Sequence, residues 1–360
     1  MTIFDLVKSA ELAAYWNELT KDRQPYLGET LFPDDKKLGL DLKWIKGSKG
    51  LPIVLKPSAF DAAAVPRPRI GFSTLSTQMP FFKESMYIDE ALRQELNMVL
   101  ETNNQAYIDS VVNRVFNDQI ALLEGARARR EMMRMMALTT GMISITANGQ
   151  NYDYDYGLDP VINKATVDVS WADTENAHPV NDIRGWQDKI EDATGVRPTR
   201  AVCSRKTWGY LLNNLEIKKN IFAASGGQGQ MNDARLNQHL LDELDLRVVV
   251  YSKRYADETG ATFAYVPDDT FVLFPEGTLG KSWFGTTPEE SDLMASQVAN
   301  VSIVETGVAI TTIEKADPVN VETKVTMINL PSFEAADQVH IADVVIADED
   351  DDDDDEGEEE

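Results

Sequence analysis

One stretch of this chain constrains the fold more than any other, because residues 89–138 contain no proline and a single glycine, Gly125. When residues 108–136 are placed on a helix at 100° per residue, one side is apolar and the other is mostly polar. The apolar side consists of Ile108, Val111, Val115, Leu122, Met133 and Met136, and the polar side of Asp109, Asn113, Glu124, Arg127 and Glu131. Such a helix is about 43 Å long at 1.5 Å per residue. We therefore expect a rod that packs against other elements along its whole length.

The chain before this helix alternates between short regular elements and irregular ones. Residues 3–19 predict a short helix, and Leu40 to Trp44 alternates apolar and polar residues as a strand does. Residues 56–70 contain three prolines, which favours an extended and exposed loop. Residues 70–88 are strand-like again. An excursion of this kind buries little surface against its own chain.

Beyond Gly141 the pattern becomes mixed. Asn148-Gly149 lies between two alternating runs, which is the strongest short-range signal for a β-hairpin. From about residue 178, helices and short buried strands alternate. The predicted elements are helices at Pro179–Thr194, after the cap Ser204 and at Asp233–Leu244, and strands at Lys164–Trp171, Arg200–Cys203, Leu246–Tyr251 and Phe271–Phe274. Two long β-like runs follow, Val298–Ile313 and Val319–Leu330.

The charge of the chain argues against one class of function. Sixty acidic residues against thirty-four basic ones give a net charge of −26, and from Asp348 to Glu360 every residue except Gly357 is acidic. Without those twelve acids the chain still carries −14. A protein that binds nucleic acid by neutralising phosphates should be basic, so this class is disfavoured. The terminal acidic run has nothing apolar to bury, and we expect it to be a disordered, solvated tail.

No set of residues predicts an active site, a cofactor site or a metal site. The three histidines lie far apart in the sequence, and no Cys/His spacing resembles a zinc site. The only cysteine, Cys203, lies in an apolar strand pattern and is expected in the core. We find no P-loop ending after Gly226-Gly-Gln-Gly229 and no Gly-x-Ser-x-Gly motif. Neither a signal peptide nor a membrane span is predicted.

The long helix carries a row of arginines, Arg127, Arg130 and Arg134, that occupies one 60° sector. This row could face packaged nucleic acid or the carboxylates of a partner. A plain solvated face explains the same pattern equally well. The sequence alone leaves these alternatives open.

Several motifs, in their order along the chain, resemble the lambda-type major capsid protein E family, whose members have the Hong Kong 97 phage fold. Val54-Leu-Lys-Pro57 leading into Pro66-Arg-Pro-Arg69 resembles the extended loop of that family. Asp118 to Gly125 lies where the family's spine helix runs. Tyr265 to Phe274 resembles the turn Pro-Asp-x-Thr that precedes an apolar strand. Thr311–Asp317 followed by Val325 to Pro331 resembles the closing strands.

The resemblance implies an α+β fold with an N-terminal arm, an extended β-loop, a peripheral domain with the spine helix and an inserted mixed α/β axial domain. The implied limits are 1–39 for the arm, 40–88 for the loop, 89–164 with 306–330 for the peripheral domain, 165–305 for the axial domain, 331–347 for a C-terminal strand and 348–360 for the acidic tail.

The resemblance also implies a function. The chain would be a major capsid protein that assembles as pentamers and hexamers into an icosahedral phage head around double-stranded DNA. It would be made in the host cytoplasm and reside in the virion, with scaffold, portal and decoration proteins as partners and no membrane. The alternatives are an encapsulin-like compartment shell, which shares the fold, and a mixed α/β enzyme.

The N-terminal arm and the extended loop would then hold neighbouring subunits together. The candidate interface residues are Trp44, Ile45, Leu55, Phe60, Arg67, Arg69 and Phe72.

Overall fold

The computed structural model describes residues 7–45, 74–88, 90–101, 105–147, 149–223, 229–257, 259–294, 299–316 and 319–346. The chain divides into two compact units. The first comprises Met1–Leu158, Arg254–Tyr265 and Gly277–Asp337, and the second comprises Asp159–Lys253, Val266–Glu276 and Gln338–Glu360. Helices and sheets occur in both units, so the predicted α+β class is confirmed.

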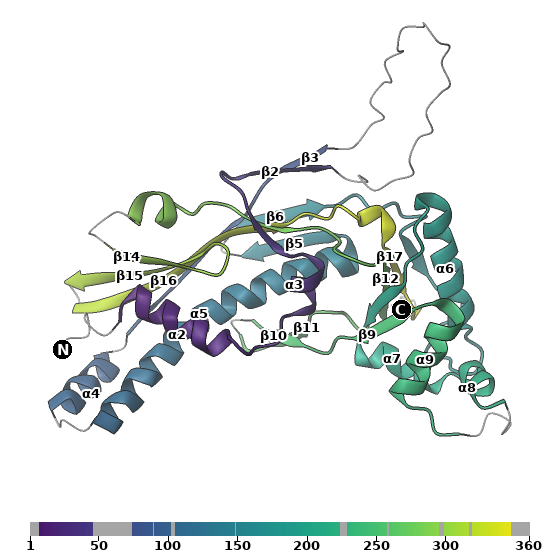
Figure 1. Ribbon diagram of the computed structural model, residues 1–360, viewed down its shortest axis with the longest axis horizontal. Helices are drawn as coiled ribbons and strands as arrows, with labels where there is room; N and C mark the ends of the chain where they lie inside the picture. The colour runs from purple at the N-terminus through teal and green to yellow at the C-terminus, as the bar shows by residue number, and fades with distance from the viewer. Residues whose placement is uncertain are drawn as a thin grey trace, which may run out of the picture. The chain divides into compact units, whose positions relative to one another are not determined.

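The first unit is built around a six-stranded sheet and one long helix (Figure 1). Its helices are α2 (Ser9–Thr20), α3 (Leu27–Leu31), α4 (Glu90–Glu101), α5 (Gln105–Thr140) and the π-helical turn η2 (Glu289–Leu293). The strands of its main sheet are β1 (Asp34–Lys36), β4 (Phe81–Tyr87), β13 (Ser282–Phe284), β14 (Asn300–Val304), β15 (Val308–Ala316) and β16 (Val319–Pro331).

The strand β16 is the centre of this sheet. Its 13 residues pair antiparallel with β15 along one side. Along the other side they pair antiparallel with β4 and then with β13. At the edges, β14 pairs antiparallel with β15, and β1 pairs parallel with β13.

The predicted long helix is confirmed as α5, which has 36 residues and ends where Gly141 takes a positive φ of 74°. Val111, Val115 and Leu122 are buried as expected, and they pack in one cluster with apolar residues of α2, β15 and β16. Met133 is also buried, whereas Met136 is half-buried. The helix therefore has neighbours on its apolar side, as its length requires.

Three two-stranded ribbons complete the first unit. They are β2 (Asp41–Ile45) with β3 (Thr74–Gln78), β5 (Met142–Ala147) with β6 (Gln150–Asp155), and β10 (Arg254–Ala256) with β11 (Thr262–Ala264). The β5–β6 hairpin confirms the Asn-Gly prediction, and Gly149 has the positive φ of 72° that this turn needs. Figure 1 shows the β2–β3 ribbon rising away from α3.

In its described residues, the second unit has a five-stranded sheet in the order β7-β17-β12-β8-β9 and the helices α6 to α9. Its elements are β7 (Lys164–Thr166), α6 (Pro179–Thr194), β8 (Arg200–Cys203), α7 (Arg205–Asn213), α8 (Leu215–Ile221), α9 (Asp233–Leu244), β9 (Arg247–Val250), β12 (Thr270–Phe274) and β17 (His340–Asp343). The 3-10 turn η3 (Ala336–Gln338) lies where the chain passes from the first unit to the second. The predicted helix start at Ser204 is confirmed, because the Thr207 backbone N–H donates to its Oγ at 3.3 Å.

Two predicted strands differ from the structure. The run Val298–Ile313 is not one strand but the pair β14 and β15, because the chain reverses at residues 305–307. Glu305 takes a positive φ of 52° in this turn, which a glutamate rarely adopts. Gly307 is the turn signal that the prediction of a single run passed over. The run Lys164–Trp171 forms a strand only as far as Thr166.

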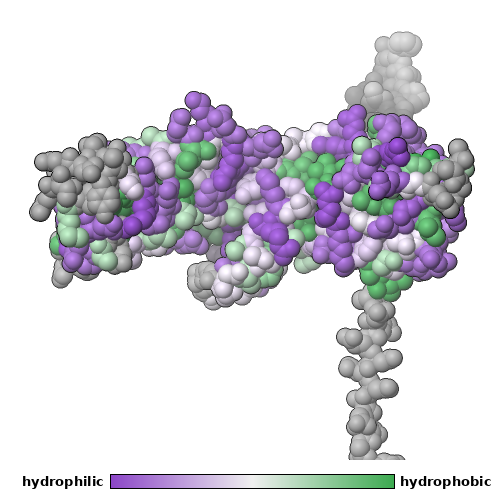
Figure 2. All heavy atoms as spheres, turned by 90° about the horizontal axis from the view of Figure 1, so that it is seen from below, coloured by the Kyte–Doolittle hydropathy of each residue, from purple (hydrophilic) through white to green (hydrophobic). Residues whose placement is uncertain are grey.

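The surface mixes polar and apolar residues. Figure 2 shows one face on which hydrophilic and hydrophobic residues are interspersed. Isolated exposed apolar side chains such as Leu38 and Val161 are normal for a folded chain. Among the described residues, no helix is both long enough and apolar enough to cross a membrane.

Candidate functional site: the arginine row of the long helix

The arginine row lies in the interior of the first unit. Arg127, Arg130 and Arg134 are 7%, 2% and 1% exposed. The two sequence interpretations of the row, a solvated face and a face for DNA or a partner, are therefore wrong for the folded chain. The helical periodicity placed the row correctly on one side of α5, but it contained no information on what covers that side.

The segment that covers the arginines comes from about a hundred residues earlier in the chain. Arg127 forms a two-pronged ion pair with Glu29 of α3, with Nε to Oε1 at 2.9 Å and Nη2 to Oε2 at 3.2 Å. The guanidinium also lies over the Tyr26 ring, 4.7 Å from its centroid. Glu29 in addition accepts from the Tyr26 backbone N–H at 3.1 Å. These contacts fix the start of α3 against the long helix α5.

Asp34, the first residue of β1, joins the other two arginines. Its Oδ2 accepts from Arg130 Nη1 at 3.3 Å, and its Oδ1 accepts from Arg134 Nη2. Because one carboxylate bridges two guanidinium groups, its position relative to α5 is determined from two directions.

Glu305 supplies a third carboxylate from the turn between β14 and β15. It accepts a hydrogen bond from Arg130 Nη2 through Oε2 and one from Trp16 Nε1 at 3.2 Å through Oε1. The positive φ of this residue is thus maintained by two partners on other elements. The cluster in this way connects α2, α5 and the turn.

The base of the cluster is closed by a glutamate of the long helix itself. Glu131 is fully buried, lies 4.0 Å from Arg134, and accepts from the Gly28 backbone N–H at 3.1 Å. A Cβ added at Gly28 would come within 2.4 Å of Glu131 Oε2 and 2.9 Å of Arg134 side-chain atoms. Position 28 therefore requires glycine for space. Like Arg127, Glu131 was predicted on the polar side and is instead buried.

Burial opposes the charges in this cluster. It raises the pKa of Asp34 above its ordinary value even though Arg134 and Arg130 favour the charged form. Burial also lowers the pKa of Arg134. Burial favours a higher pKa for Glu29, but the hydrogen bond and charge of Arg127 hold its pKa below the ordinary value. The ions are paired, but the arginines have lost their hydration, so the gain from pairing is opposed by the cost of desolvation.

Two further ion pairs hold the rest of β1. Asp35 accepts from Lys281 Nζ at 2.6 Å, and Lys36 donates to Glu290 of η2. Both pairs are more exposed than the arginine cluster. Every charged side chain of β1 is therefore paired with a residue that is distant in the sequence.

The second unit contains the turn that carried part of the resemblance. In Pro267-Asp-Asp-Thr270, Asp269 has a positive φ of 64°. Its carboxylate accepts from Lys206 Nζ at 2.7 Å and from the Tyr210 hydroxyl at 2.8 Å, while its backbone N–H donates to Thr207 Oγ1 at 3.0 Å. The turn thereby attaches α7 to the start of β12, which is a structural role.

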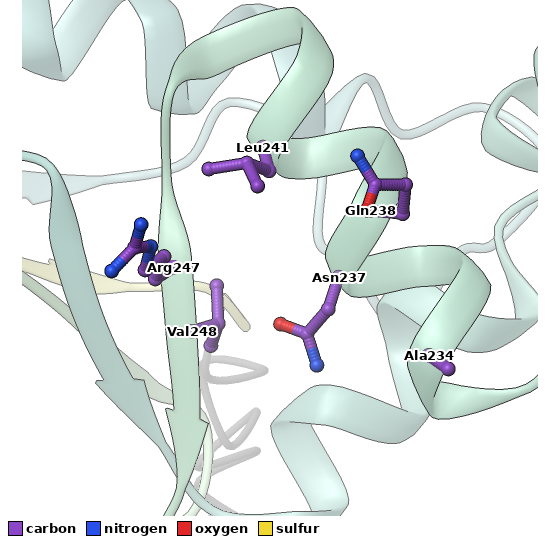
Figure 3. A pocket seen from close by; sticks show the side chains of 6 residues that line it. All are labelled: Ala234, Asn237, Gln238, Leu241, Arg247 and Val248. Carbon is purple, nitrogen blue, oxygen red and sulfur yellow. The ribbon is translucent and has the colours of Figure 1, made fainter.

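An open depression of about 320 Å³ lies between α9 and β9 of this unit (Figure 3). It is lined by Ala234, Asn237, Gln238, Leu241, Arg247 and Val248. The lining has one cation and two amides, so it offers no nucleophile or general base. Within the described ranges no group of three or more potential metal ligands occurs.

Comparison with known proteins decides the identity. The sequence matches the family described as phage major capsid protein E over residues 8–344. The chain belongs to this family. It is a phage major capsid protein, and the predicted resemblance is confirmed.

Solved structures support the Hong Kong 97 phage fold of this capsid protein. A crystal structure assigned to the capsid protein of a prophage of E. coli CFT073 is 16% identical, covers 94% of this chain and 99% of its own, and has a TM-score of 0.58. A phage-related protein from Bordetella bronchiseptica RB50 is 12% identical, covers 94% of this chain and 97% of its own, and has a TM-score of 0.52. At such identities the likeness concerns the fold.

The candidate interface residues of the capsid protein fall mostly outside the described residues. Leu55, Phe60, Arg67, Arg69 and Phe72 are among these. The backbones of Trp44 and Ile45 lie in β2, opposite Leu75 and Thr74 of β3. The predicted acidic tail also lies outside the described part of the chain.

Cys203 of the capsid protein is buried in β8, as predicted. Burial raises the pKa of its thiol to about 12, so it is not a nucleophile at neutral pH.

Proposed function

We propose that this capsid protein assembles as pentamers and hexamers into the icosahedral head of a phage that encloses double-stranded DNA. The observation that carries the proposal is the family match over residues 8–344, and the long helix α5 and the β2–β3 ribbon support it. The chain acts as a structural protein rather than an enzyme.

The way in which subunits join is part of the same proposal. In the described part of the chain the strands β2 and β3 pair only with each other, so the continuation of this ribbon is suited to lie on a neighbouring subunit. The interface residues would be Trp44, Ile45, Leu55, Phe60, Arg67, Arg69 and Phe72. Apolar anchors of this kind supply most of the energy of an interface, whereas the surrounding residues exclude water.

The other proposed partners are those that a phage head requires. Scaffold, portal and decoration proteins would contact the shell, and DNA would be enclosed without sequence-specific contacts. The arginine row takes no part in DNA binding because its charges are already paired inside the subunit. A chain with a net charge of −26 does not capture DNA in the host cytoplasm, where the protein would be made.

The test is electron microscopy of the protein expressed alone and of particles from an infected or induced host. We expect closed shells with five-fold and six-fold clusters, and DNA inside the native particles. Native particles that contain a protein cargo and no DNA would instead support a compartment shell. A soluble monomer that never forms shells would refute the proposal.

The acidic tail offers a second test of the shell. A chain truncated after Ala347 should still close into shells, because a run of like charges with no apolar residue adds nothing to a packed interface. Its particles should migrate more slowly toward the anode in native gels. Failure of the truncated chain to assemble would show that the tail is a binding element.

A further inference from the structure

We infer that the buried arginine cluster is a positioning device, which fixes β1 on β13 and thereby the place from which the β2–β3 ribbon leaves the subunit. The inference rests on the proposed function, because a displaced ribbon matters only if the ribbon contacts a neighbour.

The strand β1 cannot find its place by hydrophobic burial. Its sequence is Asp-Asp-Lys, and it pairs with β13 through only three residues, Asp34 with Ser282, Asp35 with Trp283 and Lys36 with Phe284. Register is weakly specified in a strand that has no apolar face. Phe32, fully buried, anchors the chain before Pro33, but no apolar side chain holds the strand that follows.

If β1 shifted by one residue along β13, the free-energy cost would come only from the charges of the side chains next to it. Because Pro33 is followed by two aspartates and then two lysines, a shifted strand would place Asp35 before the arginines and Lys37 before Glu290. Two ion pairs would thus be reproduced in the wrong register. The shift would, however, place Lys36 against Lys281, and like charges at this distance repel. The pattern of charges therefore selects one register.

The cluster controls the ribbon because the connection between them is short. The Lys37 backbone N–H donates to Phe284 O at 2.8 Å, and four residues later β2 begins at Asp41. The Met79 backbone N–H, directly after β3, donates to Leu40 O at 2.9 Å. The base of the ribbon thus has two supports, because β2 starts four residues after Lys37 and β3 ends three residues before Phe81 of β4, which pairs with β16. A shift of one residue would move this base by about 3.3 Å.

A pair of variants separates positioning from plain stability. Asp34→Asn leaves Arg134 buried without its carboxylate and should lower the thermal midpoint. The double variant Asp34→Leu with Arg134→Met removes both charges, while Arg130 keeps Glu305 and Glu131 keeps the Gly28 N–H. An apolar pair of similar volume should restore the midpoint. It is not directional, however, so it does not hold β1 from two directions as the bridging carboxylate of Asp34 does. Asp35→Asn is the matched control, because it breaks an exposed pair in the adjacent position.

The readouts are the thermal midpoint, hydrogen exchange of the ribbon amides and the form of the particles. In the double variant we expect a normal thermal midpoint and malformed shells. We also expect the amides in 41–45 and 74–78 to exchange roughly tenfold faster, a factor that corresponds to 1.4 kcal/mol. The control should resemble the wild type in all three. The inference is overturned if the double variant regains wild-type exchange and wild-type shells, or if its midpoint stays low, because the cluster would then act through stability alone. If the wild type itself forms no shells, the proposed function fails, while the exchange measurement still decides the inference.

Discussion

Acidification of this protein should destabilise the second unit through one buried histidine, His340. The side chain is completely buried, its Nδ1–H donates to Ile162 O at 2.7 Å, and its ring stacks on Trp186 at a centroid distance of 5.4 Å. Because the acceptor is a carbonyl oxygen, Nδ1 must carry the proton of the neutral ring. Burial lowers the pKa of His340 from 6.5 to about 4, and the Lys189 charge acts in the same direction.

The direction and size of the effect follow from this pKa. A histidine whose pKa is lower in the folded state than in the unfolded state contributes its full stability above the unfolded value of 6.5. As the pH falls from 6.5 toward 4, His340 binds a proton in the unfolded chain but stays neutral in the folded chain. The free energy of unfolding should therefore decrease by about 2 kcal/mol between pH 7 and pH 5, and by about 3 kcal/mol once the pH is below 4.

The assay is urea unfolding at pH 7 and at pH 5, followed by hydrogen exchange of the amides in β12 and β17. In His340→Asn the side-chain amide can still donate to Ile162 O but does not titrate, so the variant should be less stable at pH 7 and lack this share of the pH dependence. The difference between wild type and variant isolates His340 from the carboxylates. His178→Asn is the control, because His178 is exposed and its hydrogen bond with Glu216 raises rather than lowers its pKa. Equal pH dependence of the wild type and His340→Asn would refute the reasoning.

Three further predictions concern the first unit. Val115→Asp buries a carboxylate against the sheet and should cost several kcal/mol of stability, enough to prevent accumulation of soluble subunit. As the control, Ala121→Asp on the exposed side of the same helix should leave the melting temperature unchanged. Gly28→Ala should lower the free energy of unfolding by about 1–3 kcal/mol because its Cβ would overlap a carboxylate of α5. Gly125→Ala, which meets no atom closer than 3.9 Å, should be neutral or stabilising, and a reversed order of the two would contradict the packing argument. Deletion of residues 56–70 should leave a subunit with normal circular dichroism that does not form shells, and closed shells in sedimentation would disprove the role of the loop.

The sequence by itself determined the elements that depend on neighbours along the chain. The long helix, the Asn-Gly hairpin, the Ser204 cap and the helix Pro179–Thr194 were all predicted close to their observed limits. Each of them depends on local propensity, on periodicity or on backbone constraints at a few positions, and such signals are contained in a short window. The family, too, was accessible, because the order of these elements is itself a sequence property.

Only the tertiary structure decided what surrounds the arginine row. Periodicity assigns Arg127, Arg130 and Arg134 to one side of a helix, but whether that side meets water or protein depends on carboxylates about a hundred residues away and beyond. Glu29 and Asp34 lie in a five-residue helix and a three-residue strand, elements too short and too polar to be predicted from periodicity. A charge pattern shows where ions are, and only the fold determines whether they are buried and paired.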